Sequence, residues 1–293
     1  MAKIGVVMPV YNGEKTICAS LMSLIEQTFT PWLCIIVNDG STDGTIDEIK
    51  RINDNRFYII HLEKNRGRGY ARKIALSKIK ELNIPYMCIL DADDFYYPDK
   101  LAWQYEYMES NKKISLAASS LGYTDADLNL SGVQELFSTE KELRYDRYEE
   151  FVSVSHNGAI IRVSDTGDVT FDETVLLGED QDFLIRFLHG KSYVYIPRIS
   201  YLYRREESFS RKKYLDSLSF TELTMSKLPV SGKHFLKLKT TNFFKKIIIN
   251  ILFFFKREQL YLRRLGRKPN DDELEYHRSF VTGHIINQGK SGL

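Results

Sequence analysis

The hydrophobic pattern of the first hundred residues alternates between short, fully apolar runs and amphipathic stretches of helical period. The apolar runs, which indicate strands buried on both faces, cover residues 3–8, 33–37, 57–62 and 86–90. The amphipathic stretches cover residues 17–25, the segment carrying Ile46 and Ile49, and residues 71–79. This strand–helix alternation predicts an α/β fold, with a doubly wound, mostly parallel central sheet flanked by helices.

Beyond Leu101 the pattern is less regular. Strands are predicted at 114–121 and 156–162, and the polar stretch 124–150 between them is predicted to be loop with some helix. A short helix at 183–188 and short edge strands at 193–196 and 201–203 follow. A boundary near residue 215 predicts two parts, which are a body of residues 1–215 and a helical, basic region of residues 216–293.

The charge is distributed unevenly along the chain. The net charge is +2, but the segment from Lys227 to Lys268 carries twelve Lys or Arg and only one acidic residue, which leaves the remainder at −9. Such asymmetry indicates two surfaces with different partners. The rest of the chain is acidic and lacks any known motif for nucleic-acid recognition, which argues against nucleic-acid binding.

The targeting and redox signals favour a cytoplasmic protein. Three widely separated cysteines without CxxC spacing predict reduced thiols in a cytosolic protein. The N-terminal apolar run is too short for a signal peptide, since Pro9 ends it. No apolar stretch is long enough to span a bilayer.

Three acidic clusters lie in order along the chain, at residues 38–44, 91–94 and 178–182. The first two each follow a predicted parallel strand, so both are expected at the ligand-binding edge of the sheet. The strongest is Asp91-Ala92-Asp93-Asp94, in which alternating carboxylates at a strand end project to one side. A hard cation such as Mg²⁺ or Mn²⁺ would offset their repulsion and would share carboxylates with substrate phosphates. The alternatives are a solvated acidic loop, or Asp94 as the cap of the helix that starts near Pro98.

The order and spacing of these clusters over residues 3–210 resemble the family 2 glycosyltransferases, which are inverting, nucleotide-sugar-dependent enzymes of the GT-A fold. The resemblance implies that Asp93 binds the metal, Mn²⁺ or Mg²⁺, and that Asp91 contacts the ribose. It also implies a general base at Asp180, with Glu179 nearby contacting the acceptor or the structure. Asp182 is the rival base, and a helix N-terminus that simply favours acids is the structural alternative.

The remaining nucleotide contacts also follow from the resemblance. The family's base pocket matches Pro9, Tyr11, Asn12 and Asp39, and the loop from Asn65 to Arg72 would place Arg72 near the base or ribose. That loop contains Gly67-x-Gly69, but it lacks the third glycine of a dinucleotide fingerprint, which argues against an NAD-dependent oxidoreductase.

The stretch Tyr203 to Arg211 departs from the family pattern, because it lacks a histidine found in many relatives. Arg204, Arg205 or Arg211 are candidate phosphate partners in its place. His156 falls where the acceptor side of the pocket is expected.

Residues 243–256 form a predicted amphipathic helix with a broad apolar arc and an opposite arc that carries lysines. This helix belongs to the basic stretch 243–268. Its pattern is suited to binding an anionic membrane surface at the inner face of the plasma membrane. The alternative is that this helix packs on the catalytic domain with its lysines solvated.

The sequence therefore predicts a hexosyltransferase-type enzyme that uses a nucleotide-diphosphate sugar, expected to be UDP-linked, and a glycan or lipid-linked oligosaccharide acceptor. The alternative is a non-catalytic relative of the same fold that binds nucleotide sugars or acts as a scaffold. The sequence specifies neither the sugar, the acceptor linkage nor the oligomeric state.

Overall fold

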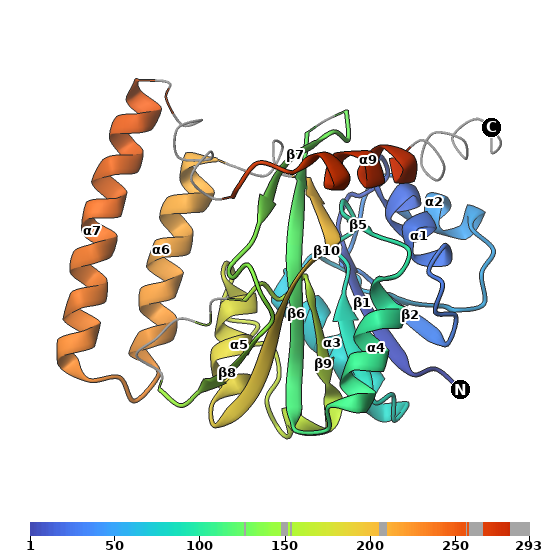
Figure 1. The fold of residues 1–293 in the computed structure, drawn as a ribbon, viewed down its shortest axis with the longest axis horizontal. Coiled ribbons are helices and arrows are strands. Elements are labelled where there is room, and N and C mark those ends of the chain that lie inside the picture. The colour runs from blue at the N-terminus through green and yellow to red at the C-terminus, as the bar shows by residue number, and fades with distance from the viewer. Residues whose placement is uncertain are drawn as a thin grey trace.

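The computed structural model describes residues 1–125, 127–147, 152, 154–204, 210–255, 257 and 266–281. A ten-stranded mixed sheet forms the centre of the molecule, and helices cover both of its faces (Figure 1). The strands are β1 (Ile4–Val10), β2 (Trp32–Asn38), β3 (Phe57–His61), β4 (Tyr86–Ile89), β5 (Phe95–Tyr96), β6 (Ile114–Thr124), β7 (Leu130–Gln134), β8 (Lys141–Tyr145), β9 (Ala159–Arg162) and β10 (Lys191–Arg204). The α-helices are α1 (Ile17–Ile25), α2 (Thr45–Arg51), α3 (Arg68–Glu81), α4 (Lys100–Ser110), α5 (Glu179–Leu188), α6 (Arg211–Ser226), α7 (Gly232–Phe254) and α9 (Asp271–Phe280).

The N-terminal half of the sheet is parallel, as the apolar runs predicted. The main strand order is β3-β2-β1-β4-β9-β6-β10-β5, with β7 on β6 and β8 on β10. The strands β1, β2, β3 and β4 pair in parallel, and the β1–β2 register places Val10 opposite Asn38. Their carboxyl ends therefore meet at one edge of the sheet, where the first two acidic clusters begin.

Two hydrophobic cores lie on the two faces of this sheet. One is formed under α3 and α5, where Ala75 and Phe183 are fully buried. The other is formed under α1, α2 and α4, where Leu21 and Leu101 are fully buried. Burial on both faces explains why β1 and β2 contain almost no polar residue.

Two predictions of local structure are wrong. The described part of the polar stretch 124–150 contains no helix; it contains β7 and β8, which pair antiparallel with β6 and β10. The two short edge strands predicted at 193–196 and 201–203 are one long strand, β10, which lies inside the sheet between β6 and β5. Pro197 and Arg198 interrupt the apolar pattern of β10, and the ladder to β6 shifts register between Ile196 and Tyr201.

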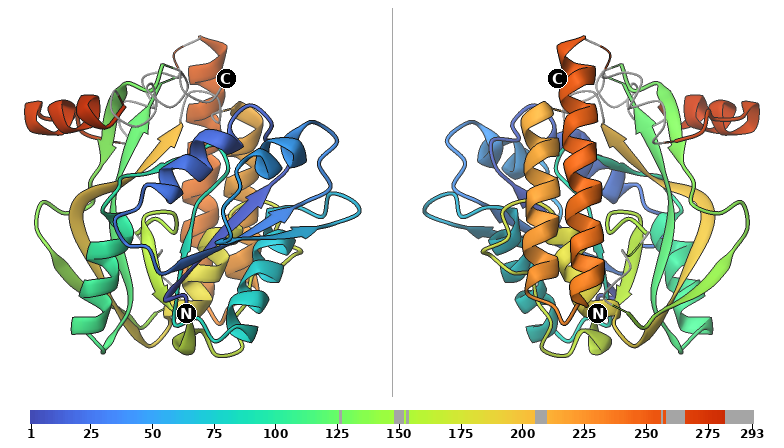
Figure 2. Two further views of the ribbon diagram at one scale, coloured as in Figure 1. Left: turned by 90° about the vertical axis from the view of Figure 1, so that its right-hand side faces the viewer. Right: turned by 90° about the vertical axis from the view of Figure 1, so that its left-hand side faces the viewer.

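The described C-terminal region is helical but does not form one separate layer. Helices α6 and α7 run side by side as a hairpin at one edge of the molecule, while α9 lies apart from them, beyond β7 (Figures 1 and 2). Helix α9 begins with a capping box formed by Asn270 and Glu273, and it buries Phe280 in a third core with Phe95 and Tyr97. None of the described helices has the length and apolarity that crossing a membrane requires.

Candidate active site

The Asp39 carboxylate closes the loop that precedes α3. Asp39 directly follows β2 and is 3% exposed. Its Oδ1 accepts from the backbone N–H of Arg66 at 2.7 Å, and its Oδ2 accepts from that of Gly67 at 2.8 Å. Gly40 has a φ of +73°, and a Cβ there would lie 2.6 Å from the backbone of Lys64, so this close approach requires glycine. Asp39 therefore fixes the 64–67 loop against the end of β2.

The end of β1 is joined to the same turn. The N–H of Asn12 donates to Ser41 Oγ at 2.9 Å, and Asn12 Oδ1 accepts from the N–H of Thr42 at 2.9 Å. Pro9 is buried within β1, whereas the neighbouring Tyr11 is 49% exposed. Asn65, the next predicted residue, accepts from the N–H of Gly67 at 3.1 Å through its Oδ1. The predicted nucleotide-binding residues from three segments thus lie around one bonded turn.

Arg72 links the second and third acidic clusters. Its Nη2 donates to Asp91 Oδ1 at 2.7 Å, and its Nη1 donates to Glu179 Oε1 at 2.9 Å. The Arg72 and Glu179 side chains are each only 2% exposed, while that of Asp91 is 14% exposed. Arg68 Nε lies 3.3 Å from the same oxygen of Glu179. A single guanidinium therefore holds the loop after β4 against the start of α5.

These contacts shift the pKa values of the paired groups. Burial alone would raise the pKa of Asp91, but the charges of Arg72 and Arg68 outweigh burial and hold that pKa below its ordinary value. Burial raises the pKa of Glu179, and the two guanidinium groups offset this rise only in part. Burial would lower the pKa of Arg72, but its carboxylate partners raise it, so Arg72 remains charged.

Asp93 and Asp94 differ in their surroundings. Asp94 is 1% exposed and accepts from the Tyr201 hydroxyl at 2.6 Å and from the N–H of Arg204 at 2.9 Å. Burial and the charges of Asp93 and Asp91 raise the Asp94 pKa well above its ordinary value. Asp93 is exposed, and within the described part of the chain it has no hydrogen bond to another side chain. The surrounding protein and the charge of Asp91 raise the pKa of Asp93.

Asp180 occupies the first turn of α5 beside Glu179. The helix starts after Gly178, which has a φ of +79°. The rival base, Asp182, is 2% exposed and pairs with Arg186, whose Nε donates to it at 3.0 Å. Asp180 is half-buried, and no described side chain forms a hydrogen bond with it. Asp182 therefore has a structural role within α5, while Asp180 remains available to a ligand.

The structure adds Asn157 and Tyr201 to this cluster. Asn157 Nδ2 donates to Asp91 Oδ2 and to the Tyr201 hydroxyl, both at 3.1 Å. The Tyr201 hydroxyl also accepts from the N–H of Asp91 at 3.2 Å. The predicted residue His156 directly precedes Asn157 and was a partial signal for it, but nothing in the sequence pointed to Tyr201.

His156 and Arg204 have less open positions than the sequence suggested. His156 is 1% exposed, and its ring packs beside the stacked rings of Phe171 and Phe183, with ring centroids at 5.5 and 5.6 Å. Burial, together with the charge of Arg72, lowers the His156 pKa well below its ordinary value. The Arg204 guanidinium lies over the Phe95 ring at 4.8 Å.

The second candidate phosphate partner, Arg205, lies outside the described residues. The third, Arg211, begins α6, and its Nε donates to Asn250 Oδ1 at 2.7 Å. Arg211 is therefore engaged in the helical hairpin.

The donor set fits a divalent cation bound together with a ligand. Among the described residues, no three acidic, histidine or cysteine side chains converge closely enough to hold a metal by themselves. Mg²⁺ commonly takes only one or two carboxylates and completes its shell with water and substrate phosphates. The exposed Asp93 carboxylate, with its raised pKa, suits this arrangement.

Comparisons with known proteins identify a family and a shared fold. The family model described as Glycosyl transferase family 2 matches residues 5–166. The Escherichia coli protein WfaP, a UDP-Glc:alpha-D-GlcNAc-diphosphoundecaprenol beta-1,3-glucosyltransferase, is 29% identical over 171 residues, which cover 58% of this chain and 65% of WfaP. The chain spans 63%, 55% and 65% of the length of the first three curated relatives that it matches.

Two solved structures share the fold at low sequence identity. TarS 1–349 from S. aureus in complex with UDP superposes with a TM-score of 0.60 at 20% identity, over 80% of this chain and 69% of that one. The mannosyltransferase PcManGT from Pyrobaculum calidifontis, in complex with GDP-Man and Mn²⁺, gives a TM-score of 0.55 at 14% identity, over 77% and 63%. The fold is therefore of the GT-A type, as predicted.

Proposed function

Because the chain belongs to glycosyl transferase family 2, we propose that it is an inverting glycosyltransferase. Its donor is a nucleotide-diphosphate sugar, of which a UDP-sugar is the best candidate, and its acceptor is a glycan or a lipid-linked oligosaccharide. The UDP bound to TarS and the UDP-glucose and diphosphoundecaprenol in the WfaP name support these two classes.

The observation that carries the proposal is the Arg72 bridge. It joins Asp91, from the segment expected to bind the donor, to Glu179, from the segment expected to contain the base. These carboxylates come from segments far apart in the sequence, and a purely structural role would not require exposed Asp93 and half-buried Asp180 beside them. The arrangement supplies both groups that an inverting transfer needs, namely a base and a binding site for the departing diphosphate.

The proposed reaction is one displacement at the anomeric carbon. Asp180 takes the proton from the acceptor hydroxyl while the acceptor oxygen forms its bond to that carbon. The bond between the anomeric carbon and the diphosphate oxygen breaks with inversion, and the nucleoside diphosphate leaves with the electron pair. Glu179 orients the start of α5 through Arg72, and it does not accept the proton.

Asp93 is the residue that would hold Mn²⁺ or Mg²⁺. When bound, the ion would neutralise charge on the departing diphosphate. Asp94 is held by Tyr201 and Arg204 beneath this position, so its role is to fix the loop that presents Asp93.

The nucleoside would lie between the ends of β1 and β2. Each Asp39 oxygen accepts one backbone N–H and keeps a second lone pair, so Asp39 can still accept a hydrogen bond from the base. Exposed Tyr11 offers a ring for stacking beside it. Both terminal nitrogens of the Arg72 guanidinium donate to protein carboxylates, so we assign Arg72 a positioning role rather than direct contact with the nucleotide.

A lipid-linked acceptor would place the enzyme at the cytoplasmic face of the membrane, where such carriers meet nucleotide sugars. This location is part of the proposal, as are the metal and the donor.

The test is transfer from a panel of UDP-, GDP- and dTDP-sugars with Mn²⁺, followed by NMR of the product's anomeric configuration. We expect Asp180→Asn to lower kcat by about 10²- to 10⁴-fold, the range for loss of a general base, with UDP affinity unchanged. Glu173→Gln, which neutralises an exposed acid of the neighbouring ion pairs, is the matched control and should leave kcat near wild type.

Retention of configuration would refute the single displacement. If the chain binds UDP, transfers sugar from no donor, and binds UDP equally well as Asp180→Asn, the non-catalytic relative would be favoured instead.

A further inference from the structure

The polarity of helix α7 is reversed relative to an ordinary surface helix. Three polar residues of α7, one turn apart, face its neighbour α6. Asn242 Nδ2 donates to the Leu218 carbonyl at 3.2 Å, Lys246 Nζ donates to Ser219 Oγ at 3.2 Å, and Asn250 Oδ1 accepts from Arg211. The hairpin is therefore held in part by hydrogen bonds on the side where apolar contacts are usual.

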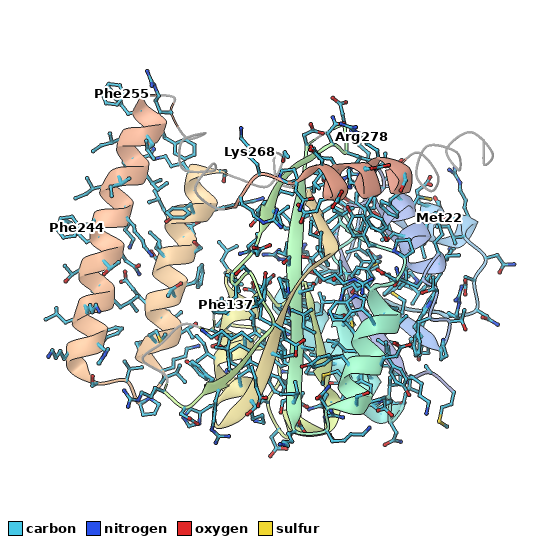
Figure 3. All side chains as sticks on the ribbon, in the orientation of Figure 1. Met22, Phe137, Phe244, Phe255, Lys268 and Arg278 are labelled. Carbon is cyan, nitrogen blue, oxygen red and sulfur yellow. The ribbon has the colours of Figure 1, made fainter. Side chains whose placement is uncertain are left out.

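The opposite side of α7 is apolar and exposed. We call this side the outer face of α7, and its large side chains are between 40% and 80% exposed. They are Phe243, Phe244, Ile247, Ile248, Ile251, Phe254 and the following Phe255. Figure 3 shows Phe244 and Phe255 pointing away from the body of the molecule. An open hollow of about 640 Å³ at the C-terminal end of α7, lined mainly by Ile251 and residues 253–255, continues this surface.

The body of the protein does not cover this face. The contacts of the hairpin with the main core come from its connecting end, where Leu228, Val230, Phe235 and Leu238 pack on that core. Helix α7 forms the left-hand edge of the molecule in Figure 1 and lies toward the viewer in the right-hand view of Figure 2. The first part of α7 thus packs on the body with its lysines exposed, as the alternative from the sequence expected, but the outer face beyond it stays uncovered. Contiguous exposed apolar patches of this kind mark interaction surfaces.

Charge identifies the partner. Helix α7 carries five lysines and no acidic residue. Two copies packed through this face would bring their lysines together, whereas an anionic surface would attract them. Apolar residues along one face, with lysines beside them, form the pattern of helices that lie in the plane of a membrane interface.

We propose that the outer face of α7 docks on a bilayer that contains anionic lipid, with the helix lying along the surface and its phenylalanine and isoleucine side chains inserted. The proposal does not rest on the proposed function, because binding to vesicles requires neither donor nor acceptor.

The test is co-sedimentation of the full chain with sucrose-loaded vesicles of phosphatidylcholine, with and without 30 mol% phosphatidylglycerol. We expect binding to the anionic vesicles, and at least a tenfold lower partition coefficient for the double variant Phe244→Ser/Ile248→Ser, since each loses a large inserted side chain. The matched control is Tyr58→Ser/Leu82→Ser, which removes two other exposed apolar side chains, 41% and 37% exposed. Circular dichroism confirms that each variant is folded.

A second pair of variants tests the charge. We expect Lys237→Gln/Lys245→Gln to weaken binding to the anionic vesicles severalfold, whereas Lys50→Gln/Lys113→Gln, with the same change in net charge, should not. Raising NaCl from 0.1 to 0.5 M should also weaken binding, because salt screens attraction between exposed lysines and lipid.

Equal binding of Phe244→Ser/Ile248→Ser and wild type would overturn the proposal, as would failure of wild type to bind anionic vesicles. Analytical ultracentrifugation without lipid tests whether a second copy of the chain binds to this face instead. A wild-type dimer that Phe244→Ser/Ile248→Ser dissociates would assign the face to a second copy of the chain and would also overturn the proposal. Sugar transfer in solution by a chain that does not bind vesicles would reject this inference and leave the proposed function intact.

Discussion

The buried Arg72 bridge can be tested by replacing Arg72 with methionine, which has a similar length and no charge. Arg72 is 2% exposed, and its two hydrogen bonds of 2.7 and 2.9 Å are made to carboxylates that are themselves largely buried. Of the two carboxylates, Glu179 depends more on Arg72, because its Oε2 has no hydrogen-bond partner among the described residues. Removing Arg72 would leave two buried carboxylates without most of the positive charge that balances them.

Breaking a buried ion pair by removing one partner costs about 3–5 kcal/mol. Small domains unfold with about 5–15 kcal/mol in total, so we expect Arg72→Met to lower Tm by on the order of 10 °C, taking about 2–4 °C per kcal/mol. The double variant Arg72→Met/Glu179→Gln should regain part of this loss, because glutamine removes one of the two stranded charges. The measurement is urea and thermal unfolding followed by circular dichroism.

The matched control is Arg144→Met, which removes an exposed guanidinium. The Arg144–Asp146 pair has a similar distance of 2.9 Å, but both side chains are 58% exposed, and such pairs contribute less than about 1 kcal/mol. A loss of less than about 1 kcal/mol for Arg72→Met would refute the reasoning. A double variant as unstable as the sum of its single variants would refute the coupling between Arg72 and Glu179.

Two further predictions concern the attachment of the C-terminal helices. Asp172 accepts from Lys227 Nζ at 3.0 Å, and although burial raises its pKa, hydrogen bonds from Thr174 and Lys227 outweigh this and lower the pKa to about 2. Its stabilising contribution is therefore present above about pH 4 and lost as pH falls towards 2. Urea unfolding should show Asp172→Asn less stable by on the order of 1 kcal/mol at pH 6, and the difference should shrink as pH falls from about 4 towards 2; a constant difference would contradict the shift. The buried His277 ring bonds the Tyr97 hydroxyl at 2.9 Å and the Leu128 carbonyl at 2.7 Å, so His277→Ala should weaken the docking of α9 by about 1–3 kcal/mol. Hydrogen exchange should then increase at residues 271–280 and not in β1; unchanged protection of α9 would contradict this docking role.

The sequence predicted the parallel half of the fold well, because those strands are buried on both faces. A run such as Ile35, Ile36 and Val37 leaves few alternatives, and β2 follows it closely. Strand β10 was divided in two because Pro197 breaks the apolar pattern, although pairing with β6 carries the strand past it. Strand β8 was missed because its residues are mostly exposed, so only pairing with β10 identifies it.

The site was predictable where function depends on local spacing, and not where it depends on tertiary contacts. The Asp91–Asp94 cluster is visible as a motif directly after a strand. The contact between Arg72 and Glu179 joins residues 107 positions apart, and Tyr201 reaches Asp94 across the same separation. No periodicity or spacing rule encodes such a contact.

The same difference applies to α7. A helical wheel shows its apolar arc, but it does not show which arc faces the protein. The hydrogen bond from Asn242 to the Leu218 carbonyl settles the direction, and that bond exists only once the hairpin has formed. Sequence analysis therefore found the amphipathic helix and chose no orientation for it.

The distribution of positive charge supports the proposal that the site binds a cation and an anionic ligand together. Arg72 contacts Asp91 and Glu179 directly, and Asp94 is compensated by hydrogen bonds from Tyr201 and the backbone. Asp93, beside them, receives no hydrogen bond from a described side chain. The fold therefore neutralises the carboxylates that hold it together and leaves negative charge at its exposed edge. A lone diphosphate would be repelled there, whereas a diphosphate carrying a divalent ion would be attracted. Selection for the complex over the free nucleotide thus follows from which carboxylates the fold leaves unpaired.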